Sequence, residues 1–111
     1  MSETAAIKKQ LKIKTGSAKR LFKEQGLYQK EQEELQRKLD KRIAEDAEDW
    51  DIKSTRRRME ESGRMVVDSS TRLGDVVLDL RELVLAAEQD PELAEDPELI
   101  AAKGILEEVS V

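Results

Sequence analysis

The sequence predicts an all-α fold, an elongated antiparallel three-helix bundle with left-handed, coiled-coil-like packing. One apolar residue recurs at every seventh position in the second half of the chain, at Ile52, Met59, Val66, Leu73, Leu80 and Ala87. Because seven residues make two turns of a slightly underwound helix, these side chains form one seam that another helix must cover. Only 38% of the 111 residues are hydrophobic and 41% are charged. These proportions suit a single narrow bundle domain over residues 1–111, in which most of each helix faces solvent.

The first helix is expected over residues 3–44. Apolar residues recur through this stretch at spacings of three, four and seven, the pattern of one buried helix face. They are Ile7, Leu11, Ala18, Leu21, Tyr28, Leu35 and Leu39. Polar side chains interrupt the same stripe at Lys14, Gln25, Gln32 and Arg42. Such interruptions lower the stability of a helical bundle, but they can fix how its helices align.

A run of acidic residues over positions 45–51 breaks this periodicity and predicts a tight connection. The second helix is expected over residues 51–87. Asp49 and Asp51 are candidate N-caps, because an aspartate side chain accepts hydrogen bonds from the free N–H groups of a first helical turn. Carboxylates also suit the positive end of a helix. Trp50 is expected to plug the end of the bundle where the chain reverses.

The positions that alternate with the seven-residue seam change character along the second helix. Thr55, Ser62 and Ser69 are small and polar, whereas Val76 and Leu83 are apolar and branched. The first half of the helix is therefore expected to pack more loosely or more closely than the second. The second half should be the more stable one, because apolar burial is the main stabilising contribution to folding.

One pattern, Asp-Pro-Glu-Leu, occurs at residues 90–93 and again at residues 96–99. Aspartate at the N-cap followed by proline at the first helical position is a helix-start signal. The third helix is expected over about residues 91–109. Two alternatives stay open, because a proline inside a helix removes a hydrogen bond and kinks the axis. Either a short turn begins at Pro91 and a separate helix at Pro97, or one helix is kinked near Pro97.

The composition argues against catalysis. The chain has no cysteine, histidine or asparagine, which removes the thiol nucleophile, the commonest general base and the acceptor for N-glycosylation. The acidic run before the second helix lacks the glycine and terminal glutamate of a calcium loop. We expect no enzyme activity, metal or cofactor. No apolar run approaches the roughly 18 residues that span a bilayer, so we expect a cytosolic protein without a membrane partner.

Charge is distributed unevenly along the chain. Lys and Arg outnumber acids by eight to two in residues 1–30, whereas acids outnumber Lys and Arg by thirteen to four in residues 61–111. Either the oppositely charged ends attract each other, or each end faces a complementary patch on a partner. The basic cluster near the N-terminus offers phosphate contacts. The net charge of −5 and the scarcity of aromatic residues argue against a nucleic-acid partner, and none is expected.

Short strings of residues carry a further signal. In the first helical stretch they are Ile13-Lys14-Thr15-Gly16, Lys19-Arg20-Leu21, Lys23-Glu24, Tyr28 and Lys30-Glu31. Around the connection they are Glu45-Asp46, Asp49 and Asp51-Ile52-Lys53. In the second helical stretch they are Glu61-Ser62, Met65, Asp68, Arg72-Leu73 and Leu78-Asp79-Leu80. In this order, over roughly residues 11–80, the chain resembles the tubulin-binding cofactor A family.

This resemblance implies a small cytosolic chaperone linked to the microtubule cytoskeleton. Such a protein captures β-tubulin, as a folding intermediate or released subunit, in the cofactor-assisted pathway to the α/β-tubulin heterodimer. The resemblance also implies a monomer that needs no cofactor and acts beside other tubulin-folding cofactors. The alternative, from the seam alone, is a structural coiled-coil scaffold subunit that pairs with another chain.

The resemblance also implies which residues contact β-tubulin. They are Lys14, Lys19, Arg20, Lys23, Tyr28, Glu31, Asp49, Asp51, Lys53, Glu61, Arg64, Asp68 and Arg72. Two of them have a competing interpretation from the residues themselves. Asp51 suits a helix cap, and Tyr28 suits a core position on the apolar stripe of the first helix.

Overall fold

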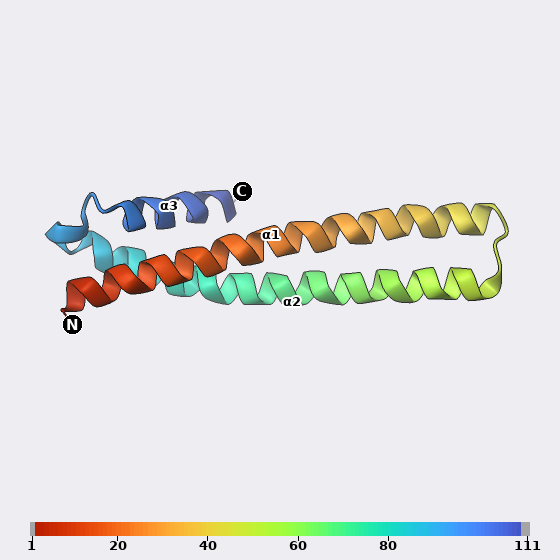
Figure 1. Cartoon of the computed structure of the whole chain (residues 1–111), viewed down its shortest axis with the longest axis horizontal. Helices are drawn as coiled ribbons and strands as arrows, with labels where there is room; N and C mark the ends of the chain where they lie inside the picture. Colours follow the sequence, from red (N-terminus) through yellow and green to blue (C-terminus); the bar gives the residue numbers. More distant parts are fainter. Residues whose placement is uncertain (1, 110–111) are drawn as a thin grey trace. The chain divides into compact units, whose positions relative to one another are not determined.

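A computed structural model describes residues 2–109 of the chain. The described residues form three α-helices and one 3₁₀ turn, without a strand (Figure 1). Helix α1 spans Glu3–Ala44, α2 spans Asp49–Glu88, the 3₁₀ turn η1 spans Pro91–Leu93, and α3 spans Pro97–Val109. The expected all-α helical bundle is confirmed. Helix α2 begins two residues earlier and ends one residue later than expected.

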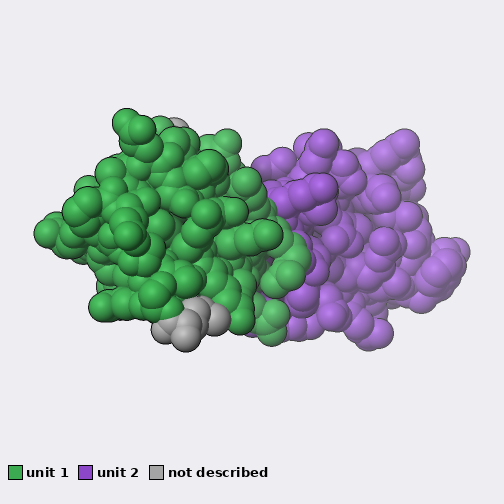
Figure 2. Space-filling view, turned by 60° about the vertical axis from the view of Figure 1, so that its left-hand side comes forward, with its two compact units in different colours: residues 1–22, 71–111 green, residues 23–70 purple. Residues whose placement is uncertain are grey.

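The contacts of the chain divide it into two compact units (Figure 2). Unit 1 comprises residues 1–22 and 71–111, and unit 2 comprises residues 23–70. Each unit contains a stretch of α1 and a stretch of α2, and unit 1 also contains η1 and α3. The two helices run antiparallel within each unit. In unit 1 the Lys14 ammonium contacts the Asp79 carboxylate at 3.2 Å, and in unit 2 the Gln25 side-chain amide donates to the Ser70 hydroxyl.

Unit 1 contains an apolar core to which α1, α2, η1 and α3 all contribute. Its buried members are Leu11, Ala18, Leu21, Leu73, Val77, Leu80, Val84, Ala87, Leu93, Leu99, Ala102 and Ile105. On α2 the alternating positions Val76 and Leu83 are only partly buried, and their neighbours Val77 and Val84 are the buried ones. A seven-residue seam that faces a single partner helix does not include Val77 and Val84. Because α3 packs into the same core, α2 buries a broader face than a two-helix seam requires.

Unit 2 is a hairpin of two helical stretches with a mostly polar interior. Its only buried apolar side chains are those of Leu35 and Leu39. On α2 the small polar residues Thr55, Ser62 and Ser69 are buried instead, with at most 4% of their surface exposed. The two halves of α2 therefore face different interiors, an apolar core in unit 1 and a mostly polar interior in unit 2.

The connection between α1 and α2 is closed by backbone hydrogen bonds. Ala47 N–H donates to the Arg42 carbonyl at 2.9 Å, and Asp46 N–H donates to the Ile43 carbonyl at 3.2 Å. This pair of bonds is the Schellman arrangement, which places its C′ residue in the left-handed region. Asp46 occupies that position, with φ of 58°. The prediction that Trp50 plugs the bundle end is wrong, because α2 begins at Asp49 and places Trp50 on its outer side with 71% of its surface exposed.

The predicted N-caps differ in outcome. Glu48, not Asp49 or Asp51, precedes α2, and its carbonyl accepts from Asp51 N–H and Ile52 N–H. The two aspartates lie instead in the first turn of α2, where negative charge suits the helix dipole. The Asp-Pro pairs do cap, because the Asp90 and Asp96 carboxylates accept from Glu92 N–H and Glu98 N–H at 3.0 and 2.9 Å. Pro91 thus opens η1, and Pro97 opens the separate helix α3.

The start of α3 is attached to α1 by an ion pair within unit 1. The Lys8 ammonium lies 3.0 Å from the Asp96 carboxylate, whose side chain is only 10% exposed. The hydrogen bond from Lys8, together with that from Glu98 N–H, lowers the pKa of Asp96. The same carboxyl group therefore caps α3 and connects it to the first helix.

Candidate functional site

An open hollow of about 390 Å³ lies between the α1 and α2 stretches of unit 2. Tyr28 and Glu31 of α1 line one side of it, three residues apart and so on one helix face. The opposite side is formed by α2, through Arg58, Glu61, Ser62 and Met65. These four residues recur at spacings of three, one and three, so they also share one face. The hollow combines an aromatic ring and a thioether with side chains of both charges.

The hollow brings together three residues that the sequence resemblance predicted as contacts, namely Tyr28, Glu31 and Glu61. Tyr28 is half-buried, so it is partly available at the surface and not a core residue. Glu31 and Glu61 are exposed. Such a site suits binding, because a tyrosine offers apolar area with a polar tip and the charges can orient a partner.

Sequence reasoning missed the other residues of the hollow, Arg58, Ser62 and Met65. Arg58 and Met65 lie three residues before and four residues after Glu61, so the helical period alone placed all three on one face. What the period could not show is that the groove between the helices opens toward that face. Arg64, which was predicted as a contact, lies beside the hollow and forms a weak exposed pair with Glu61 at 3.7 Å.

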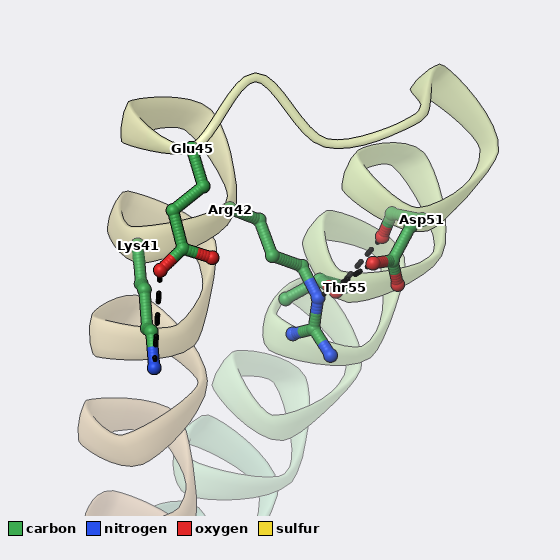
Figure 3. Close-up of polar contacts among 5 residues, drawn as sticks. All are labelled: Lys41, Arg42, Glu45, Asp51 and Thr55. Carbon is green, nitrogen blue, oxygen red and sulfur yellow. Dashed lines mark hydrogen bonds and ion pairs between the residues drawn. The ribbon is translucent and has the colours of Figure 1, made fainter.

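Asp51 has an internal structural role in unit 2 (Figure 3). The Arg42 guanidinium reaches from α1 and donates to its carboxylate at 2.8 Å. The Thr55 hydroxyl donates to the Asp51 carbonyl at the same distance. Both side chains of the Arg42–Asp51 pair are 31% exposed. Because Arg42 belongs to α1 and Asp51 to α2, the pair joins the two helices near their connection. The nearby pair of Lys41 and Glu45, at 3.9 Å, lies entirely on α1 and the residue after it.

The remaining predicted contact residues lie on exposed helix surface. In unit 2 they are Lys23, Asp49, Lys53 and Asp68. In unit 1 they are Lys19, Arg20 and Arg72. Lys14 is half-buried, and its ammonium is paired with Asp79 beside a second hollow in unit 1. These seven side chains are exposed and so accessible from solvent. Contact through Lys14 or Asp51 would require that residue to exchange its partner, Asp79 or Arg42.

The described residues hold no group of three or more His, Cys, Asp or Glu side chains placed to bind a metal ion. Within residues 2–109, no helix combines the length and the apolar character that crossing a membrane requires.

Comparisons with known proteins address the family of the chain. The family model described as "Tubulin binding cofactor A" matches residues 6–106. The Homo sapiens protein "Tubulin-specific chaperone A" is 38% identical over 103 residues, which cover 93% of each chain. The Arabidopsis thaliana protein "Tubulin-folding cofactor A" is 33% identical over 99 residues, covering 89% of this chain and 87% of the relative.

Two solved structures have the same fold. The structure titled "human tubulin chaperone cofactor a" superposes with a TM-score of 0.80 at 36% identity, covering 95% of this chain and 99% of the other. The crystal structure of tubulin folding cofactor A from Arabidopsis thaliana gives a TM-score of 0.85 at 31% identity, covering 96% and 97% of the two chains. The resemblance inferred from the residues is thereby confirmed, and the chain belongs to the tubulin binding cofactor A family.

Proposed function

We propose that this chain is a tubulin-folding chaperone that captures β-tubulin, as a folding intermediate or released subunit, on the outer faces of its helices. The names of its relatives support the tubulin client. The observation that carries the capture surface is the hollow of unit 2, where Tyr28, Glu31 and Glu61 meet. Capture would precede formation of the α/β heterodimer, with other tubulin-folding cofactors acting on the same client in the cytoplasm.

The contrast between interior and surface supports capture by a monomer. Within unit 1, the apolar seam of α2 is buried in a core that α1 and α3 also form. This part of the seam is therefore not available for pairing between chains. The predicted contact residues are mostly exposed and charged. Charged rims contribute chiefly to association rate and to specificity, while a partly buried aromatic residue such as Tyr28 contributes binding energy. No bond-making chemistry is needed for this role.

A pair of charge reversals tests the hollow. The variant Glu31→Lys/Glu61→Lys changes two carboxylates of the hollow, and we expect its affinity for β-tubulin to fall by roughly tenfold or more. The matched control is Glu33→Lys/Glu60→Lys, which changes one exposed acid on each of the same helices by the same charge. Affinity is measured by retention of β-tubulin on immobilised chain, and helicity by circular dichroism. Equal affinities of the two variants would remove the hollow from the proposal.

A second comparison tests the basic residues predicted from the resemblance. Reversing Lys19, Arg20 and Lys23 to glutamate should weaken β-tubulin capture while the helical circular dichroism signal is retained. The double reversal of Lys9 and Lys12, which are exposed lysines of α1 outside the predicted contact set, serves as control and should keep most of the capture. Unchanged capture by the triple variant would exclude this basic surface as a contact.

A further inference from the structure

The two units differ in how much apolar surface holds their helices together. Unit 1 has a cluster of twelve buried apolar residues drawn from four elements. Unit 2, all of whose residues are described, has only two buried apolar residues, Leu35 and Leu39. Since burial of apolar area is the dominant favourable contribution to folding, unit 2 has much less to oppose the entropy of an open chain.

The seven-residue seam of α2 shows the same difference. In unit 1 its members Leu73, Leu80 and Ala87 are at most 5% exposed, in the core that α3 completes. In unit 2 the equivalent members are only half-buried, and no third helix is present within this unit to cover them. These members are Ile52, Met59 and Val66.

The polar interior of unit 2 contributes little to holding α1 against α2. The Thr55 hydroxyl donates to the Asp51 carbonyl, and the Ser69 hydroxyl donates to the Val66 carbonyl. Both bonds stay within α2, so they survive separation of the two helices. A hydroxyl bonded to its own helix also stabilises that helix little.

Two polar contacts between the helices of unit 2 lie near its ends. The Gln25 amide bonds the Ser70 hydroxyl near one end of the unit, and the Arg42–Asp51 pair lies near the other. A neutral hydrogen bond and a partly exposed ion pair each contribute only modestly, because water offers both partners comparable interactions.

We infer that residues 23–70 form a separately opening hairpin, whose helices part and melt while unit 1 stays folded. The separated stretches of α1 and α2 are each about 22 residues long, a length at which isolated helices are marginal in water. Opening exposes the inner faces of unit 2, including the half-buried Tyr28 and Met59, and leaves the core of unit 1 intact. This conformational property does not depend on the proposed client.

Native-state hydrogen exchange of the full chain tests the inference. The amides of residues 30–42 and 52–66 should exchange at least about tenfold faster than those of residues 73–87 and 99–107, because they need only the partial opening. The slow amides should exchange through complete unfolding. Equal protection of the two sets of amides would overturn the inference.

Two matched stabilising variants distinguish a separate opening from a uniformly weak chain. Gly26 lies in unit 2 and Gly74 in unit 1, both within helices and with open space around an added Cβ. Glycine to alanine in a helix should change an opening equilibrium by roughly fivefold. Gly26→Ala should slow exchange in both units, because complete unfolding includes unit 2. Gly74→Ala should slow exchange in unit 1 alone. If Gly74→Ala slows both units alike, or Gly26→Ala leaves unit 2 unchanged, the hairpin does not open separately.

Discussion

Replacement of Leu80 by alanine tests whether the predicted seam of α2 holds the folded chain together. Leu80 belongs to the seven-residue seam and has no exposed surface in the core of unit 1. The substitution removes three carbon atoms, which is worth about 2.4 kcal/mol at roughly 0.8 kcal/mol per buried methylene. The residual cavity adds to this loss, so the free energy of unfolding should fall by about 3–5 kcal/mol.

Leu78 provides a matched control two residues away on the same helix. Its side chain is 61% exposed, so Leu78→Ala removes the same atoms with little loss of burial. The free energy of unfolding should then change by less than about 0.5 kcal/mol. The two variants share the same change in helix propensity, and their difference therefore reports burial alone.

Urea unfolding followed by circular dichroism at 222 nm measures both variants. A domain of this size is commonly stable by about 5–15 kcal/mol, so the loss at Leu80 remains measurable. The m-value should be retained if the variant changes stability and not the unfolding mechanism. Similar losses for Leu78→Ala and Leu80→Ala, or a loss below about 1 kcal/mol at Leu80, would refute the reasoning.

Three further predictions concern single polar groups, each measured by urea unfolding. Asp46→Gly should stabilise by about 1 kcal/mol, because glycine adopts the observed φ of 58° without strain, and a destabilised variant would contradict this. Thr15→Val should stabilise by about 1 kcal/mol, since the buried Thr15 hydroxyl has no hydrogen-bond partner among the described residues, whereas Thr55→Val should stabilise less because its hydroxyl donates to the Asp51 carbonyl; equal gains would count against this explanation. Because the folded-state pKa of Asp96 lies below its unfolded value, its stabilisation is present above the unfolded pKa and is lost as pH falls through the folded pKa. Asp96→Asn should therefore lose less stability than the wild type between pH 5 and pH 2, and identical pH profiles would exclude this contribution.

The sequence predicted the helices well because their signals are local and repeated. The end of α1 follows from the acidic run after Ala44, and the helix starts at η1 and α3 follow from the Asp-Pro pairs. Each of these signals depends on a few neighbouring residues, so no knowledge of the packing is needed. The strings from Ile13 to Leu80 pointed to the same family that the comparisons identify.

Features that depend on the third helix or on a groove were not predictable in this way. The seven-residue pattern assumes one partner helix, and it therefore selected Val76 and Leu83 where α3 makes Val77 and Val84 the buried pair. The periodicity also does not fix the direction in which the first turn of α2 points, which is why Trp50 was misplaced. The residue period also does not show toward which helix face the groove opens, so it could not show that Arg58 and Met65 join Tyr28 in one hollow.

The molar mass of the chain in solution, alone and mixed with β-tubulin, tests the central claim most directly. Light scattering across a range of concentrations should give 12.6 kDa for the chain alone and the mass of a one-to-one complex after β-tubulin is added. A concentration-independent dimer that does not bind β-tubulin would contradict the account and favour a scaffold that pairs through its seam.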